Sequence, residues 1–397
     1  MGSTRVFPDY LGVKAFGVKM GVILPGDDIV EEVYRAVEKC HKDGLIDDGD
    51  VVCVKENVVA RAQNNFVSKE DIAEEVKRKL GLTERGSLGI LFPIASRNRF
   101  APILEGFAKA VKSGRVIVQF SFPRDCVGNQ LAPEDLDEQL GRNLFVDEIS
   151  FDEIKNVEFH HPATGVNYVK LYEEIIKREG AEPDIFLSNN PKRIIEHGPD
   201  GIVVSCIHER HQVFNKINRA FKNSITLQDL FNDPGKPAWS ECGLLGSNLY
   251  SNELIKLAPR ESFKIAKEIQ KRVMEGIGKK VEVAIYGDGA YLDPSTMIYE
   301  LADPVCSFGH TEGLVTKRKG IKYKYFVGML SCQGKCREEI ERIIESEKRK
   351  AYKVDDMRME GTTPRKMEDV VASLADLVSG SADAGTPLVI IKGILSN

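Results

Sequence analysis

The chain has 397 residues, of which 42% are hydrophobic and 29% charged, so it can bury one large core or two ordinary ones. Its net charge of −5 and pI of about 5.9 argue against a nucleic-acid or bilayer partner. The sequence shows neither an apolar run long enough to span a membrane nor a signal-peptide pattern at its beginning. Its eight cysteines do not have the paired spacing typical of a disulfide framework, which indicates reduced thiols. We therefore expect a cytoplasmic protein.

Alternating periodicities predict an α/β protein with a mixed sheet. Some segments repeat apolar residues at helical spacing, whereas others are short β-branched or apolar runs. Ser68 and Asp71 form a loose capping-box pattern that begins one helix. In chain order, the sequence predicts helices over 29–40, 68–80, 99–112, 168–178, 190–197, 261–274 and 366–379, and strands over 51–54, 116–118, 201–204, 281–286, 325–330 and 388–391.

The most informative stretch, residues 366–393, predicts an amphipathic helix, a loop of small residues and a buried strand. The loop, Ser379 to Thr386, consists almost entirely of Gly, Ala, Ser, Asp and Thr. Such residues let backbone N–H groups approach a ligand closely, and they offer oxygen atoms to phosphate or a metal. A plain helix-to-strand turn has the same composition and remains the alternative.

This stretch resembles the C-terminal motif of the coenzyme F420-0:gamma-glutamyl ligase family, which is a helix, a nucleotide-binding loop and a strand. Three other segments resemble that family in the same order. They are residues 49–63, with GDVVCV and VVARAQ; residues 243–248, GLLGSN, where the family has an AGxDASN loop; and residues 279–288, KKVEVAIYGD, like a strand that ends in a metal-binding Asp. Together the four segments cover roughly half of the chain.

The resemblance implies a ligase-like α/β domain built from two halves. The shared motifs stop near Val118 and resume near Gly243. The sequence therefore predicts an N-terminal half over 1–119, an inserted αβ subdomain over 120–240 and a C-terminal half over 241–397. The resemblance also implies a homodimer with interlocked sheets.

The activity that the resemblance implies is an amide ligase that adds L-glutamate to a carboxylate acceptor. The acceptor would be an F420 precursor, a folate-like molecule or another acidic compound. Activation by phosphoryl transfer requires GTP or ATP and divalent Mg²⁺ or Mn²⁺ held by carboxylates. The chain contains no GxxxxGK[ST] motif, so a P-loop is not available and the nucleotide site must be of another kind.

Carried over residue by residue, the resemblance makes Asp288 a metal ligand and catalytic residue, with a plain turn Asp as the alternative. Arg61 stands where the family has a nucleotide-contacting Lys and is the second catalytic candidate. The other nucleotide-binding positions that it implies are Met20, Gly21, Val22, Ile23, Glu56, Asn57, Asn248, Ser379, Gly380, Ser381, Ala382, Asp383, Ala384, Gly385 and Thr386.

Two carboxylates of the family's metal site are missing from this chain. The Asp of the AGxDASN loop falls on Leu245, and a loop Glu falls on Ser381. A hard cation needs several oxygen ligands, so a nearby carboxylate must substitute. The candidates are Asp383, which we assign to the metal site with Asp288, and Glu241 or Asp125. Without a substitute, the chain would be a non-catalytic nucleotide- or anion-binding ligase-like protein.

Three arginines outside the shared motifs are candidates for binding an anion or the substrate. Arg97 and Arg99 lie near a predicted helix start, and Arg365 precedes the last helix. Guanidinium groups suit phosphate or carboxylate, although a solvated basic patch has the same pattern. The predicted insertion also contains four histidines, His160, His161, His208 and His211. They allow a third alternative, a different enzyme in which His208 and His211 share a helical face with a metal.

Overall fold

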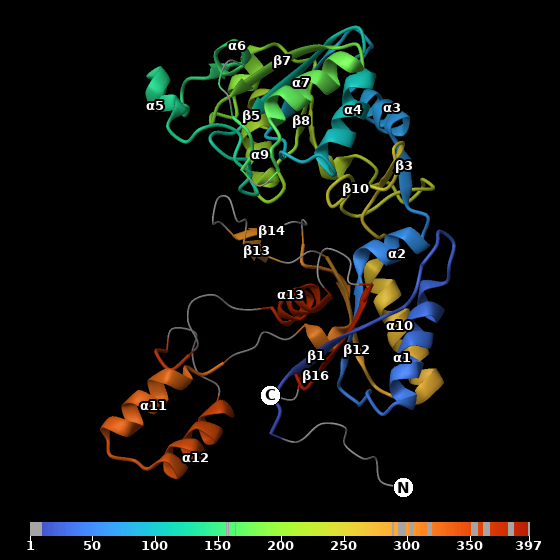
Figure 1. Cartoon of the computed structure of the whole chain (residues 1–397), viewed down its shortest axis with the longest axis vertical. Helices are drawn as coiled ribbons and strands as arrows, with labels where there is room; N and C mark the ends of the chain where they lie inside the picture. The colour runs from blue at the N-terminus through green and yellow to red at the C-terminus, as the bar shows by residue number, and fades with distance from the viewer. Residues whose placement is uncertain are drawn as a thin grey trace.

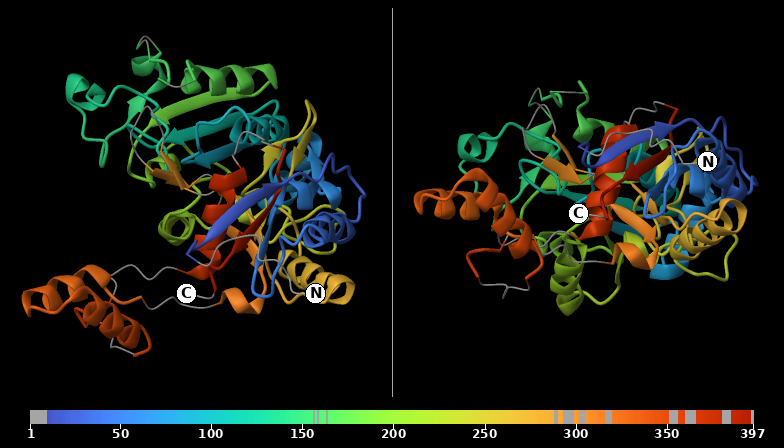
Figure 2. Two further views of the ribbon diagram at one scale, coloured as in Figure 1. Left: turned by 60° about the horizontal axis from the view of Figure 1, so that its bottom comes forward. Right: turned by 90° about the horizontal axis from the view of Figure 1, so that it is seen from below.

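The computed structural model describes residues 10–155, 157, 159–162, 164–287, 290–292, 299–301, 305–315, 320–350, 356–359, 366–379 and 385–395. These residues form a lower body around a five-stranded sheet and an upper lobe around a six-stranded sheet (Figure 1). A helical hairpin, α11 (Tyr323–Cys332) and α12 (Arg337–Lys348), stands away from the lower body in Figures 1 and 2. No helix among the described residues is long and apolar enough to cross a membrane.

The lower body has a mixed sheet in the order β1-β16-β2-β12-β15. The strands are β1 (Lys14–Val18), β16 (Leu388–Lys392), β2 (Val51–Lys55), β12 (Glu282–Tyr286) and β15 (Ser307–His310). The β2–β12 pair is parallel and the other pairs are antiparallel. One face packs against α1 (Ile29–Lys42) and α10 (Ser262–Ile277), and the other against α13 (Met367–Ser379). The predicted mixed α/β fold is confirmed.

The upper lobe has the strand order β6-β7-β5-β4-β8-β9. The strands are β6 (Ile149–Ser150), β7 (Glu182–Leu187), β5 (Arg115–Phe120), β4 (Ser87–Leu91), β8 (Gly201–Val204) and β9 (Ser224–Thr226). All pairs are parallel except the one with the edge strand β6. Numbered along the chain, the parallel strands follow the order 3-2-1-4-5 of doubly wound sheets.

Helices cover both faces of this upper sheet, as the doubly wound order requires. On one face lie α3 (Lys69–Leu80), α4 (Phe100–Ala110) and α7 (Tyr168–Arg178). On the other face lie α8 (Arg193–Glu196) and α9 (Arg210–Ala220). Buried residues of both helix layers pack on the sheet, so its central strands have apolar neighbours on each side.

The chain passes from the lower sheet to the upper sheet before residue 120, where the sequence predicts the domain boundary. β4 and β5 precede that residue, yet they pair with β8 and β7 in the upper sheet. The change of sheet therefore comes before Ser87, because β4, α4 and β5 are the first βαβ unit of the upper lobe. The predicted strand over 201–204 is β8, and it lies in a different sheet from β2 and β16.

A three-stranded sheet connects the lobes. It consists of β10 (Asn248–Leu249), β11 (Leu254–Lys256) and β3 (Phe66–Ser68). Next to it, the side-chain Nδ2 of Asn65 donates to the carbonyl oxygens of Trp239 and Ala258, each at 2.8 Å. The remaining described elements are α2 (Glu56–Ala62), α5 (Leu136–Leu140), α6 (Phe151–Ile154), the pair β13 (Ala290–Leu292) and β14 (Tyr299–Leu301), and two 3₁₀ turns, Leu227–Asp229 and Glu312–Leu314.

The predicted helix over 68–80 is confirmed with its cap. The backbone N–H of Asp71 donates to Ser68 Oγ at 3.0 Å, and the N–H of Ser68 donates to Asp71 Oδ2 at 2.7 Å. The predicted helix over 190–197 is shorter, because only Arg193–Glu196 is helical. The predicted strand over 325–330 is wrong, since it lies within α11, where Phe326 and Leu330 form one buried stripe against Ile344. A short apolar run cannot be assigned to strand or helix by periodicity alone.

Candidate functional site

The candidate site lies at the edge of the lower sheet where β2 and β12 end and β16 begins. The parallel strands β2 and β12 end together, with Lys55 and Tyr286 as register partners. β16 runs in the opposite direction, and its first residue, Leu388, pairs with Val54. The segments after β2 and β12 and the loop before β16 therefore leave the sheet at one edge.

Side chains at this edge form a connected cluster. Lys55 Nζ lies 2.6 Å from Asp376 Oδ1 and 5.1 Å from the ring centroid of Tyr286. Burial raises the pKa of Tyr286 to about 12, while a hydrogen bond with Ser379 and the charge of Lys55 act in the opposite sense. The Tyr286 hydroxyl therefore stays protonated at neutral pH and can donate a hydrogen bond; the carbonyl oxygen of Pro387 lies 3.5 Å away.

Neither Lys55 nor Tyr286 is among the residues that the sequence identifies as candidates. The sequence feature that could have identified Lys55 as a site residue is its position at the end of the apolar run VVCVK. Ligands bind near the carboxyl ends of parallel strands, so a cation at such an end is a candidate contact. Its partner Asp376 lies 321 positions further along the chain, beyond the reach of any local pattern.

Several predicted site residues lie outside the described part of the chain. They are Asp288, Arg365 and the loop residues Gly380, Ser381, Ala382, Asp383 and Ala384. The described chain ends one residue before Asp288, at Gly287, directly after β12. It resumes at Gly385 and Thr386, and a Cβ atom added to Gly17 of β1 would lie 2.8 Å from Thr386 Cβ. This end of the predicted nucleotide loop is therefore packed against the sheet.

Arg61 and Asn57 lie on α2, which begins directly after β2. Arg61 Nη2 donates to Asn57 Oδ1 at 3.2 Å, and the buried Arg61 Nε has no hydrogen-bond partner among the described residues. Glu56 is also buried, and its two carboxylate oxygens bind Lys256 Nζ at 3.0 and 2.7 Å. Arg61 thus retains an N–H group for an anion, whereas Glu56 is engaged in an ion pair.

The predicted segment Met20–Ile23 precedes a turn that contacts α2. In that turn, the N–H of Gly26 donates to the carbonyl oxygen of Ala62 at 2.9 Å. Within the segment, Ile23 is buried in the lower core and the side chain of Val22 is exposed. The structure therefore places this segment near the end of α2, with one of its residues committed to packing.

The loop over 243–248 has different roles at its two ends. Asn248 begins β10 and is the register partner of Lys256, the residue that binds Glu56. Leu245, at the position of the family's metal-binding Asp, is only 2% exposed and packs in the core of the upper lobe. That position serves packing in this chain.

The proposed substitute carboxylates have other roles where the structure describes them. Glu241 Oε1 accepts the N–H of Glu261 at 3.0 Å. Asp125 is buried in the upper lobe, which raises the pKa of its carboxyl group. Its oxygens accept backbone N–H groups from Ala95, Val127 and Asn129. Asp125 is thus a buried structural residue and not an available ligand.

The remaining candidates lie in the upper lobe. Arg97 and Arg99 are in the loop between β4 and α4. His208 and His211 do not share a helical face, because α9 begins only at Arg210. In the part of the chain that the structure describes, no three His, Cys, Asp or Glu residues are grouped so as to hold a metal ion.

Comparison with known proteins agrees with the four motif segments. The family model described as F420-0:Gamma-glutamyl ligase matches residues 17–393. No curated protein matches the chain. The matched range includes all four motif segments, the sheet edge with Lys55 and Tyr286, and the entire upper lobe. The chain belongs to the F420-0:gamma-glutamyl ligase family.

Proposed function

We propose that this protein is a nucleotide- and metal-dependent amide ligase that adds L-glutamate to a small acidic acceptor. The observation that carries the proposal is the family match over residues 17–393. The sheet edge supports it, because the strand before Asp288, the helix with Arg61 and the loop before β16 all leave the sheet there. F420 precursors, folate-like molecules and other acids remain candidate acceptors, with GTP or ATP as the phosphoryl donor.

The reaction has two balanced steps. A carboxylate oxygen of the acceptor attacks the terminal phosphorus of the nucleotide, and the nucleoside diphosphate leaves. The amine nitrogen of L-glutamate then attacks the carbonyl carbon of the acyl phosphate. The C–O bond to phosphate breaks, the amide C–N bond forms, and the amine proton passes to phosphate or water.

The residues at the sheet edge suit the charges of this reaction. Arg61 would bind a phosphate group through its unpartnered N–H. Asp288 and Asp383 are the carboxylates that would hold Mg²⁺ or Mn²⁺. The metal would neutralise phosphate charge.

We further propose that the enzyme works as a homodimer. Light scattering at several protein concentrations tests this proposal.

Replacing the proposed metal ligand tests this function directly. We expect Asp288→Asn to weaken Mn²⁺ binding by at least about tenfold, because even outer-sphere partners of a metal contribute that much. Glutamate-dependent release of phosphate from GTP or ATP should disappear as well. Calorimetry with Mn²⁺, with and without nucleotide, measures the first effect, and a phosphate assay with candidate acceptors measures the second.

Asp152→Asn is the matched control, because the Asp152 side chain is 83% exposed and lies in the upper lobe. An Asp288→Asn variant with unchanged affinity for Mn²⁺ would rule out the proposed metal site.

The burial of Leu245 favours a second candidate function, nucleotide binding without turnover. That function predicts nucleotide binding that Arg61→Ala weakens, with no glutamate-dependent phosphate release under any condition.

A further inference from the structure

The upper lobe contains a cavity that the proposed ligase chemistry does not use. We propose that this cavity, at the carboxyl ends of β4 and β5, binds a small molecule with a carboxylate or phosphate group, and that Arg97 is its principal contact. In open, doubly wound sheets, ligands bind outside the carboxyl ends of the parallel strands. The strand order of the upper lobe is of this kind.

The composition of the cavity wall favours an anion. The cavity has a volume of 220 Å³, and its polar lining side chains are Ser96, Arg97, Asn98, Arg99, Asn129, Thr164 and Tyr168. Among the described residues that line it, Arg97 and Arg99 are the only charged ones. The exposed Arg97 guanidinium forms no ion pair or hydrogen bond with any described residue. The Arg97 guanidinium is thus a positive group that no described side chain neutralises, and such a group is suited to an oxyanion.

The loop between β4 and α4 recognises anions through side chains and not through its backbone. Its sequence, FPIASRNR, contains no glycine, so it cannot form the close backbone approach of a dinucleotide-binding turn. The first turn of α4 offers few amides, because Pro102 has no N–H and Ser96 accepts the N–H groups of Arg99 and Ala101. The planar guanidinium of Arg97 is therefore the available donor, and its geometry fits carboxylate or phosphate.

Hydrogen bonds hold this loop in place before any ligand arrives. Asp125 accepts the N–H of Ala95 at 2.7 Å, and Tyr172 donates its hydroxyl to the carbonyl oxygen of Ile94. On another side, the N–H of Leu249 donates to the carbonyl oxygen of Asn98 at 2.7 Å. A loop fixed in this way loses little conformational entropy on binding. Asp125 is therefore a positioning residue for this site.

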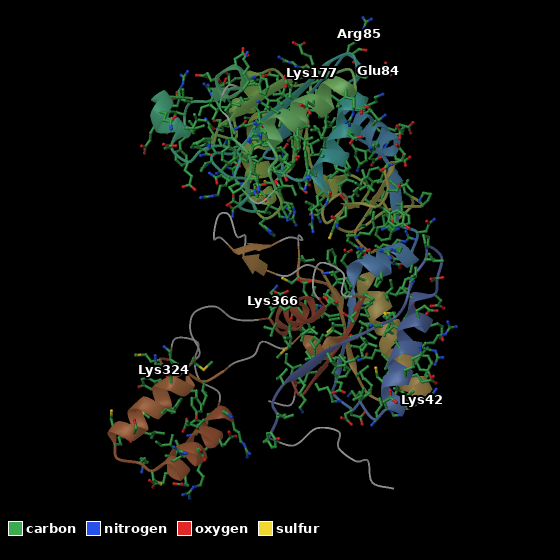
Figure 3. The ribbon with its side chains drawn as sticks, viewed as in Figure 1. Lys42, Glu84, Arg85, Lys177, Lys324 and Lys366 are labelled. Atoms are coloured by element: carbon green, nitrogen blue, oxygen red, sulfur yellow. The ribbon has the colours of Figure 1, made fainter. Side chains whose placement is uncertain are left out.

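The cavity lies at the end of the upper sheet that is turned toward the lower body. Glu84 and Arg85, which precede β4, lie at the outer end of the upper lobe, so β4 ends toward the lower body (Figure 3). The hydrogen bond from Leu249 also places the loop beside Asn248, the first residue of β10. The site is thus new but adjacent to a residue that the family motif assigns to nucleotide binding.

Binding measurements on the full chain test this site without requiring turnover. We expect inorganic phosphate, citrate or both to bind by calorimetry, and Arg97→Ala to weaken the binding by about tenfold or more, because a hydrogen bond to a charged group is lost. Arg97→Lys should restore part of the affinity. Arg85→Ala is the matched control, since it removes the same charge at the opposite end of the same strand.

The pattern across variants decides the outcome. Binding of phosphate alone identifies a phosphate ester as the ligand class, and binding of citrate alone identifies a carboxylate. The proposal is wrong if neither probe binds, or if Arg97→Ala binds both as tightly as the wild type. It is also wrong if Arg61→Ala abolishes the binding while Arg97→Ala does not, because the anion then occupies the proposed nucleotide site. Failure of the ligase assay leaves this result unchanged, since it does not depend on catalysis.

Discussion

His197 lies between two carboxylates in the upper lobe. Its Nδ1 is 2.9 Å from Asp184 Oδ2, its Nε2 is 3.2 Å from Glu148 Oε2, and its ring stacks on Phe186. The hydrogen bond to Asp184 is the main cause that raises the pKa of His197, and burial opposes it. Two carboxylates that face both ring nitrogens stabilise the imidazolium form.

This arrangement makes the contribution of His197 to stability depend on pH. Its pKa in the folded state lies above the ordinary value of 6.5. The stabilisation is therefore fully present below the unfolded-state pKa and is lost as the pH rises through the folded-state pKa. Arg115 and Arg193 pair with the same two carboxylates. We expect urea denaturation to show wild type more stable than His197→Gln at about pH 5 and this difference to shrink toward about pH 9. A difference that stays constant would contradict the assignment.

The distance between partners along the chain decides which residue contacts the sequence can predict. Ser68 and Asp71 are three positions apart, and their reciprocal capping bonds follow from a local pattern. Lys256 and Glu56 are 200 positions apart, so their buried ion pair depends on the sheets that bring them together. Glu56 is thus recognised from the family motif, but its engagement with Lys256 is not.

At the scale of elements, α3 and α4 pack with very little space between them. A Cβ atom added to Gly106 of α4 would lie 2.6 Å from Ile72 Cγ2 and 2.9 Å from the carbonyl oxygen of Lys69. Both of these neighbours belong to α3, whose side toward α4 is buried. The absence of a side chain at Gly106 is what permits this approach.

We therefore expect Gly106→Ala to destabilise the upper lobe by about 1–3 kcal/mol, the usual cost of overpacking a core. Helix propensity alone favours alanine by about 1 kcal/mol, so the sign of the change separates packing from propensity. Gly328→Ala is the matched control, since Gly328 is also helical and its added Cβ would meet nothing within 4 Å. Urea denaturation followed by circular dichroism measures both variants. A Gly106→Ala variant at least as stable as wild type would show that the helices can separate.

The position of β4 explains why the predicted division differs from the sheets. β4 is the central strand of the upper lobe, yet SLGIL contains a glycine and no β-branched run that would mark it as a strand. The predicted division rests on where the shared motifs stop, near Val118, and nothing in the pattern of β4 indicates that a second sheet begins before that point. Helix α7, by contrast, has its predicted bounds of Tyr168–Arg178, because its strong periodicity is local.

At the scale of the whole molecule, the two large cores are connected by few residues. The core of the upper lobe contains Leu104, and the core of the lower body contains Val283. Cys242 packs against both, and the other described links are mainly polar; they include the Asn65 hydrogen bonds, the β3–β11 pairing, the Glu56–Lys256 ion pair and the hydrogen bond from the N–H of Glu261 to Glu241. A connection of this size resembles an interface between domains more than a shared core.

We accordingly expect the lobes to unfold as separate cooperative units, so that a calorimetric scan shows more than one transition. Leu104→Ala removes a fully buried side chain from the upper lobe and should destabilise that lobe by about 2–5 kcal/mol. Its effect should appear in one transition only, the same one that Gly106→Ala shifts. Ile390→Ala, equally buried in β16 of the lower body, should shift the other transition by a similar amount. If either variant lowered every transition together, the two sheets would form a single cooperative unit and the narrow connection would be stronger than its contacts suggest.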